Sequence, residues 1–72
     1  MNTVNTTTWW FGIEDAESDL CGEEFFVEVH VPMDRAKRCA MIIAENNFPG
    51  EKLECYGRVG NAEAEMMGLD TY

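Results

Sequence analysis

The chain has 72 residues, of which 46% are apolar, 11% aromatic and 26% charged, and 14 Asp and Glu residues against 5 Lys and Arg residues give a formal net charge of −9. A chain of this length buries only about 60% of the surface that its unfolded form exposes, so a deep, dry catalytic pocket is not expected. The apolar content excludes a disordered acidic tail, and the negative charge excludes direct binding to nucleic acid or to an anionic membrane. We expect one folded domain over residues 1–72.

The N-terminal segment lacks the basic and apolar regions of a signal peptide, and no apolar run is long enough for a transmembrane helix. The cysteines, Cys21, Cys39 and Cys55, are odd in number and widely spaced, unlike those of a secreted disulfide scaffold. We therefore expect a cytoplasmic protein with reduced thiols. The cysteines and His30 are zinc-ligand types, but none of them have zinc-knuckle spacing, so no metal or other cofactor is predicted.

Residues 6–13 are rich in Thr, Trp, Phe and Ile and predict a first strand, with Trp9 and Phe11 on one face and Trp10 on the other. The following connection, residues 14–24, carries six carboxylates and no cation, which indicates a solvated loop.

Residues 24–31 show the clearest alternation of apolar and polar side chains in the chain. They predict a half-buried strand, which we expect at the centre of the sheet and antiparallel to the first. Four apolar residues are predicted to face the core: Phe25, Val27, Val29 and Val31.

Pro32 ends this strand, and Asp34 is predicted to be the N-cap of a helix through residues 35–47. Met41 and Ile42 are predicted to lie off the packing face, where they are available to a partner or to a second copy. The predicted packing face consists of residues at helical spacing: Met33, Ala36, Cys39, Ala40, Ile43, Ala44 and Asn47.

Residues 52–59 resume the alternation and predict a third strand. Asn61 is predicted to cap a short helix over residues 62–67, and Gly68 to end it. This order predicts an α+β two-layer sandwich, in which one helix covers a three-stranded antiparallel sheet and a short helical turn follows. In the third strand, we expect Leu53, Cys55, Gly57 and Val59 on one face and Glu54, Tyr56 and Arg58 on the other.

Catalytic chemistry is not predicted. The single histidine, His30, lies beside Glu28 on the polar face of a strand, with no Ser or Cys placed as a nucleophile, and we interpret the two as a solvated pair. The alternating acids of residues 15–19 are similar to the first ligands of an EF-hand loop. However, Leu20 and Phe26 stand where that loop requires Gly and Glu, so no calcium site is predicted.

The negative charge is concentrated in the first half of the chain. Residues 1–34 contain eight acidic side chains and no Lys or Arg, whereas residues 35–72 contain six acidic and five basic ones. One interpretation is that this charge maintains solubility. The other is that the carboxylates imitate a phosphate array and dock on a basic surface of another protein. The candidate docking acids are Glu14, Asp15, Glu17, Asp19, Glu23, Glu24 and Glu28.

Two further groups of side chains are candidates for partner binding. We expect Trp10, Phe26 and Tyr56 to form an exposed aromatic patch, unless the N-terminal tail or the C-terminal turn covers it. Three cations lie in the first turns of the predicted helix, where the helix dipole disfavours them, so they either pair with the hairpin carboxylates or contact a partner: Arg35, Lys37 and Arg38.

Three segments carry a resemblance to a known class: the strand Thr-Thr-Thr-Trp-Trp-Phe-Gly-Ile at 6–13, the helix Asp-Arg-Ala-Lys-Arg-Cys-Ala at 34–40 with the following Phe48, and the closing residues 62–72. In architecture, most of the chain resembles small acidic α+β proteins of phages and other mobile elements, among them anti-CRISPR proteins. The resemblance implies a stoichiometric inhibitor whose partner is a host protein or ribonucleoprotein complex with a basic surface, in the host cytoplasm if the chain is phage-encoded. A homo-oligomeric structural or regulatory module, such as a homodimer, is the alternative.

Overall fold

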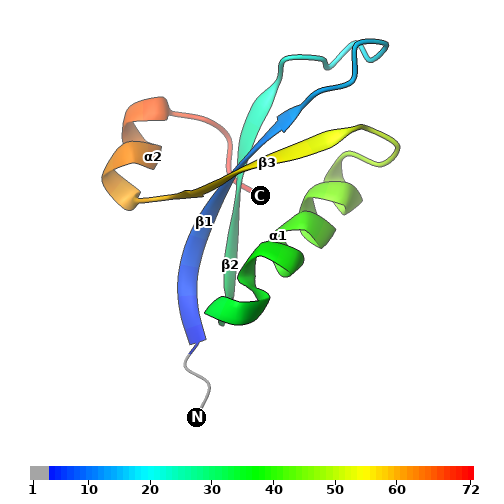
Figure 1. Ribbon diagram of the computed structural model, residues 1–72. Coiled ribbons are helices and arrows are strands. Elements are labelled where there is room, and N and C mark those ends of the chain that lie inside the picture. Colours follow the sequence, from blue (N-terminus) through cyan, green and yellow to red (C-terminus); the bar gives the residue numbers. More distant parts are fainter. Residues whose placement is uncertain (1–3) are drawn as a thin grey trace.

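The computed structural model describes residues 4–72, which form the elements β1 (Val4–Ile13), β2 (Glu24–Pro32), α1 (Met33–Asn47), β3 (Leu53–Val59) and α2 (Asn61–Met67). The three strands form one antiparallel sheet, with α1 and α2 on opposite sides of it (Figure 1). The predicted α+β class and three-stranded antiparallel sheet are confirmed. Within the described residues, neither helix has the length and hydropathy needed to cross a membrane.

The strand order is β2-β1-β3, so β1 is the central strand. The expectation that the strand at residues 24–31 is central is therefore wrong. The reason lies in the helix that follows it: the 15 residues of α1 span about 22 Å at about 1.5 Å per residue. This length carries the chain back along the sheet, so β3 runs in the same direction as β2 and finds an antiparallel neighbour in β1, while the C-terminal residues occupy the outer edge of β2.

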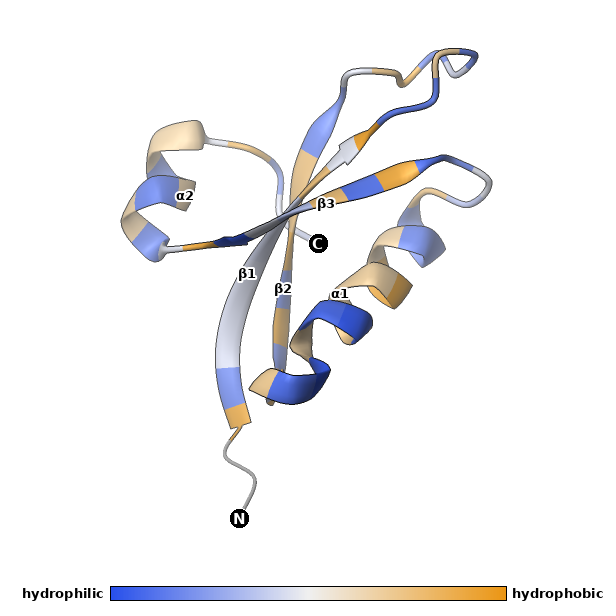
Figure 2. Ribbon diagram, in the orientation of Figure 1, coloured by the Kyte–Doolittle hydropathy of each residue, from blue (hydrophilic) through white to orange (hydrophobic). Residues whose placement is uncertain are grey.

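The core lies between the sheet and α1. Alternation along β2 places Phe25, Val27 and Val29 on the helix side, where they pack with Phe11 and Ile13 of β1. Figure 2 shows the corresponding alternation of hydrophobic and hydrophilic residues along α1. Burying one large side chain of this kind contributes about 1.5–3 kcal/mol. The helix adds three buried alanines, one per turn, whose small side chains allow close approach to the sheet: Ala36, Ala40 and Ala44.

The predicted packing face of α1 holds for its central residues but not for its ends. Met33 and Asn47 are exposed, although the neighbouring Ala36 and Ala44 are completely buried. Met41, expected off this face, is half-buried against the core, whereas Ile42 is 50% exposed, as expected for a residue off the face.

Both helices begin earlier than predicted. Pro32 precedes the first residue of α1, so Asp34 lies within the first turn and is not the N-cap. Gly60 precedes α2, so Asn61 is its first residue, and neither helix has a side-chain cap. Asp34 still stands where the helix dipole favours a negative charge. Gly68 ends α2 in the left-handed conformation, with φ of 64°, as predicted.

A β-bulge interrupts the pairing of β1 with β3. Trp10 is opposite Gly57 and Phe11 is opposite Cys55, so Tyr56 is an extra residue on β3. Gly57 has φ of 128°, a backbone conformation that favours glycine.

The bulge changes the face of the residues that follow it, because directly opposed residues in an antiparallel pair share a face. Arg58 is opposite Trp9, which packs on the α1 side, and it donates a hydrogen bond to Sδ of Met33 in α1 (3.5 Å). Val59 is opposite Thr8, on the other side of the sheet. The predicted faces of residues 57–59 are therefore wrong.

The C-terminal residues pair with the outer edge of β2. The Phe26 N–H donates to the carbonyl of Asp70 (2.8 Å), and the Tyr72 N–H donates to the carbonyl of Phe26 (2.8 Å). The Tyr72 ring meets Phe25 and Phe48 edge-on, with ring centroids 5.6 and 5.4 Å apart. This segment therefore covers an edge that would otherwise expose unpaired backbone groups.

Candidate partner-binding site

The connection between β1 and β2, together with the first residue of β2, forms what we call the acidic arm, residues 14–24, which extends beyond the sheet (Figure 1). Its backbone folds into successive turns, in which the Ser18 N–H donates to the carbonyl of Asp15 (3.0 Å) and the Glu23 N–H to the carbonyl of Leu20 (2.9 Å). Asp15 Oδ1 also accepts the Glu17 N–H (3.1 Å). The arm is thus ordered by its own hydrogen bonds while its side chains face outward.

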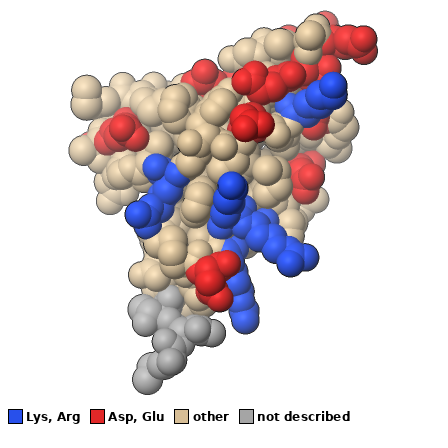
Figure 3. All heavy atoms as spheres, in the orientation of Figure 1, with Lys and Arg blue, Asp and Glu red and all other residues tan. Residues whose placement is uncertain are grey.

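The carboxylates of the arm are not neutralised by cations. Five of the six are exposed and Asp15 is half-buried. Within residues 4–72, the one ion pair joins His30 to Glu28, so no described Lys or Arg pairs with the arm. Figure 3 shows acidic side chains gathered at the end of the molecule where the arm lies, and most of the basic ones in a separate group over α1. The arm therefore presents concentrated negative charge to solvent.

The six arm carboxylates divide into two groups by their hydrogen bonds. Glu14 accepts from the Tyr56 hydroxyl (2.9 Å), Glu24 from the Trp10 indole N–H (3.1 Å), and Asp15 from the backbone of the arm. The other three have no side-chain partner among the described residues, which leaves their charges available to a partner: Glu17, Asp19 and Glu23.

An aromatic pair stands at the base of the arm, on the face away from α1. The rings of Trp10 and Tyr56 meet edge-on, with centroids 4.8 Å apart. Tyr56 lies over Gly12, where any Cβ would overlap its ring. The hydrogen bond to Glu14, partial burial and the charges of neighbouring carboxylates together raise the pKa of Tyr56 to about 12. The tyrosine is therefore a neutral hydrogen-bond donor across the physiological range.

The register brings Phe26 to the same face as this pair, because it lies directly opposite Trp10. However, Phe26 is only 1% exposed and is bridged by the C-terminal segment, so the expectation that it belongs to an exposed patch is wrong. Of the two coverings that the sequence allows, the C-terminal one is present, and residues 1–3 of the N-terminal tail lie outside the described residues. Tyr56, 41% exposed, and half-buried Trp10 remain as accessible aromatic candidates.

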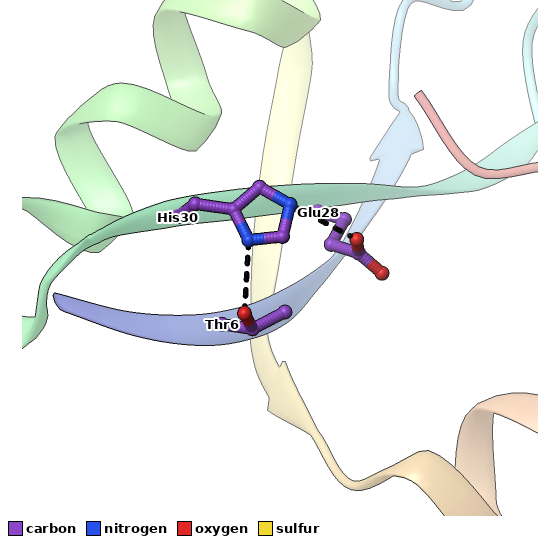
Figure 4. Close-up of polar contacts among 3 residues, drawn as sticks. All are labelled: Thr6, Glu28 and His30. Atoms are coloured by element: carbon purple, nitrogen blue, oxygen red, sulfur yellow. Dashed lines mark hydrogen bonds and ion pairs between the residues drawn. The ribbon is translucent and has the colours of Figure 1, made fainter.

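Glu28 lies apart from the arm, on β2. Its Oε1 is 3.3 Å from Nε2 of His30, whose Nδ1 is 2.9 Å from Oγ1 of Thr6 on β1 (Figure 4). All three residues are exposed, which agrees with a solvated pair of Glu28 and His30. The contact with the Thr6 hydroxyl connects this pair on β2 to β1.

The three cysteines occupy different environments. Cys39 and Cys55 are half-buried against the core, and Cys21 is exposed on the arm; all three thiols are free. Residues 4–72 contain no group of three or more His, Cys, Asp or Glu residues placed to hold a metal ion.

The cations of α1 form a second exposed group. Arg35, Lys37 and Arg38 are exposed and make no ion pair with any described carboxylate, so the pairing with the hairpin that the sequence allows is not formed. We call these three residues, with Arg58 beside Met33 at the start of the helix, the cationic face.

Two features of the site were not predicted from the sequence. One is the pair of hydrogen bonds from Trp10 and Tyr56 to arm carboxylates, which depends on the register of three strands. The other is the placement of Arg58 on the α1 side. The signal for the second was present, because an isolated glycine within an alternating strand, here Gly57, indicates a bulge.

Comparison of the chain with protein-family models, with curated proteins and with solved structures finds no match.

Proposed function

We propose that the protein is a stoichiometric, anti-CRISPR-like inhibitor whose acidic arm docks on a basic, nucleic-acid-binding surface of a host defence complex. The observation that carries the proposal is the uncompensated charge of the arm: three of its carboxylates have no partner within the described residues. Carboxylates displayed in this way attract a surface built to neutralise phosphates, and they accelerate encounter with it.

The residues at the base of the arm also suit a docking role. Trp10 and Tyr56 supply aromatic surface at its base, and aromatic residues are common anchors of protein interfaces. Their hydrogen bonds to Glu24 and Glu14 tie the base of the arm to β1 and β3, which limits the ordering cost of binding.

Capture from host lysate with the immobilised chain, followed by nucleic-acid displacement, tests the proposal. The arm variant, Glu17→Lys with Asp19→Lys, changes two carboxylates that form no hydrogen bond or ion pair with any described residue. The matched control, Glu63→Lys with Glu65→Lys on α2, makes the same change in net charge on exposed residues away from the arm. The target is the protein retained by the wild type and by the control but lost with the arm variant.

The captured protein must then bind DNA or RNA when isolated, and the wild-type chain must displace that nucleic acid at one-to-one stoichiometry. Displacement should weaken steeply with ionic strength and by at least about tenfold in the arm variant. Equal displacement by the arm variant, or retention of nucleic acid in the inhibited complex, contradicts phosphate mimicry.

A further inference from the structure

The outward side of α1 carries a shallow groove of about 620 Å³. Its floor is apolar, formed by Met41 and Ile42, and Ile42 is half exposed. From the start of the helix, the acidic Asp34 comes first, the two cations next, then the apolar floor, and the acidic Glu45 stands at the far end. The groove is lined by residues of α1 alone: Asp34, Lys37, Arg38, Met41, Ile42 and Glu45.

Nothing within the described chain occupies this groove. Lys37 and Arg38 form no ion pair with any described carboxylate. The helix dipole does not stabilise them either, because it favours cations near the C-terminal end of a helix and these two lie in its N-terminal half. The arm carries the opposite charge but lies at a different end of the molecule (Figure 3), and none of its carboxylates is within ion-pair distance of these cations. Any contact between the two must therefore involve another molecule.

We propose that this groove binds the acidic arm of a second copy of the chain. The chemistry of the arm matches the groove in two respects. Glu17 and Asp19 are uncommitted carboxylates that can pair with Lys37 and Arg38, while the groove's own carboxylates, Asp34 and Glu45, flank that contact at its two ends. Leu20 follows them directly in the turn and is 39% exposed, which makes it the apolar side chain suited to the floor between Met41 and Ile42.

The contact joins different surfaces of the two copies, so a bound pair still offers one free groove on one copy and one free arm on the other. Such head-to-tail association continues into open chains, or closes into a ring if the rotation allows. The proposal does not rest on the proposed function, because the second copy is the occupant. It does use the same arm, so an arm held in a groove is withheld from any other basic surface.

Sedimentation of the purified chain over a range of concentrations measures the association directly. Apparent mass should rise with concentration at about 0.01 M ionic strength, where the Debye length is about 30 Å, and fall to the monomer value at about 1 M, where it is about 3 Å. A groove variant, Lys37→Glu with Arg38→Glu, and the arm variant, Glu17→Lys with Asp19→Lys, should each associate at least about tenfold more weakly than the wild type.

The sign of the arm variant's effect separates docking from general charge repulsion. Two acid-to-lysine changes take the formal net charge from −9 to −5, which by itself reduces repulsion between copies. The control Glu63→Lys with Glu65→Lys carries the same net charge and should associate as well as or better than the wild type. Of these two variants with equal net charge, only the arm variant should lose association.

An equimolar mixture of the two reversed variants provides the decisive measurement. In either variant alone, the arm and the groove carry charges of the same sign at the contact. In the mixture, the arm of each variant meets a groove of opposite charge on the other variant, so association should be restored. Circular dichroism of each variant confirms that it is folded. A chain that stays monomeric at low ionic strength, or a mixture that behaves as its separate components do, overturns the proposal, and neither result bears on capture of a host target by the arm.

Discussion

At the scale of single residues, the site depends on two aromatic side chains that donate hydrogen bonds to carboxylates. Tyr56 joins β3 to Glu14, and Trp10 joins β1 to Glu24, so the base of the arm is bound to the sheet on both sides. The close approach of Tyr56 to the sheet requires the absence of a side chain at Gly12. These contacts use two of the six arm carboxylates for structure and leave the outer ones for binding.

Titration of Tyr56 tests this arrangement. The folded state raises its pKa from 10.0 to about 12, mainly through the hydrogen bond to Glu14, so the contribution to stability is complete below about pH 10 and is lost as pH rises toward 12. In Tyr72→Phe, Tyr56 is the one remaining tyrosine, and its tyrosinate absorbance should have a midpoint of about 12. Adding Glu14→Gln should move that midpoint toward 10. A midpoint unaffected by Glu14→Gln would show that the carboxylate is not the cause.

At the scale of elements, the parts of the fold that were predictable are those set by local periodicity. Alternation along β2 and the alanine spacing of α1 identify the core face directly, since each depends only on neighbouring residues. The central position of β1, the bulge at Tyr56 and the covering of Phe26 by residues 70–72 depend on pairing between distant segments. Consequently the arm and the faces of Trp10 and Tyr56 were predicted, whereas the burial of Phe26 and the side on which Arg58 lies were not.

The close packing of α1 on the sheet depends on its small alanine side chains. Ala40 is completely buried at the middle of the helix, so Ala40→Leu forces α1 away from the sheet and should lower the free energy of unfolding by about 1–3 kcal/mol. Urea denaturation measures the change. Ile42→Ala is the control. Ile42 lies on the outward side of the same helix and is half exposed, so this substitution should change the free energy of unfolding by no more than about 0.5 kcal/mol. Equal losses in the two variants would contradict the close packing of the alanine face.

At the scale of the whole molecule, the charge is distributed as a dipole. Eight acidic residues precede Arg35, six of them in the arm, and the described cations other than Lys52 gather on the cationic face. Folding does not bring the two groups together, since no Lys or Arg within residues 4–72 forms an ion pair. Both proposals follow from this separation. In each, another molecule, either a basic host surface or a second copy of the chain, supplies the opposite charge that the fold leaves unpaired.

Uncompensated carboxylates on one arm repel one another, and this repulsion should be measurable as a loss of stability. Neutralising two of them with Glu17→Gln and Asp19→Asn removes no hydrogen bond of either side chain, so the free energy of unfolding should stay equal or rise, by up to about 0.5 kcal/mol at low ionic strength. Added sodium chloride should stabilise the wild type more than this variant, because salt screens a repulsion that the variant lacks. Urea denaturation at two ionic strengths measures both effects. If neutralisation instead destabilises the chain, the arm carboxylates serve the fold and are not held in reserve for a partner.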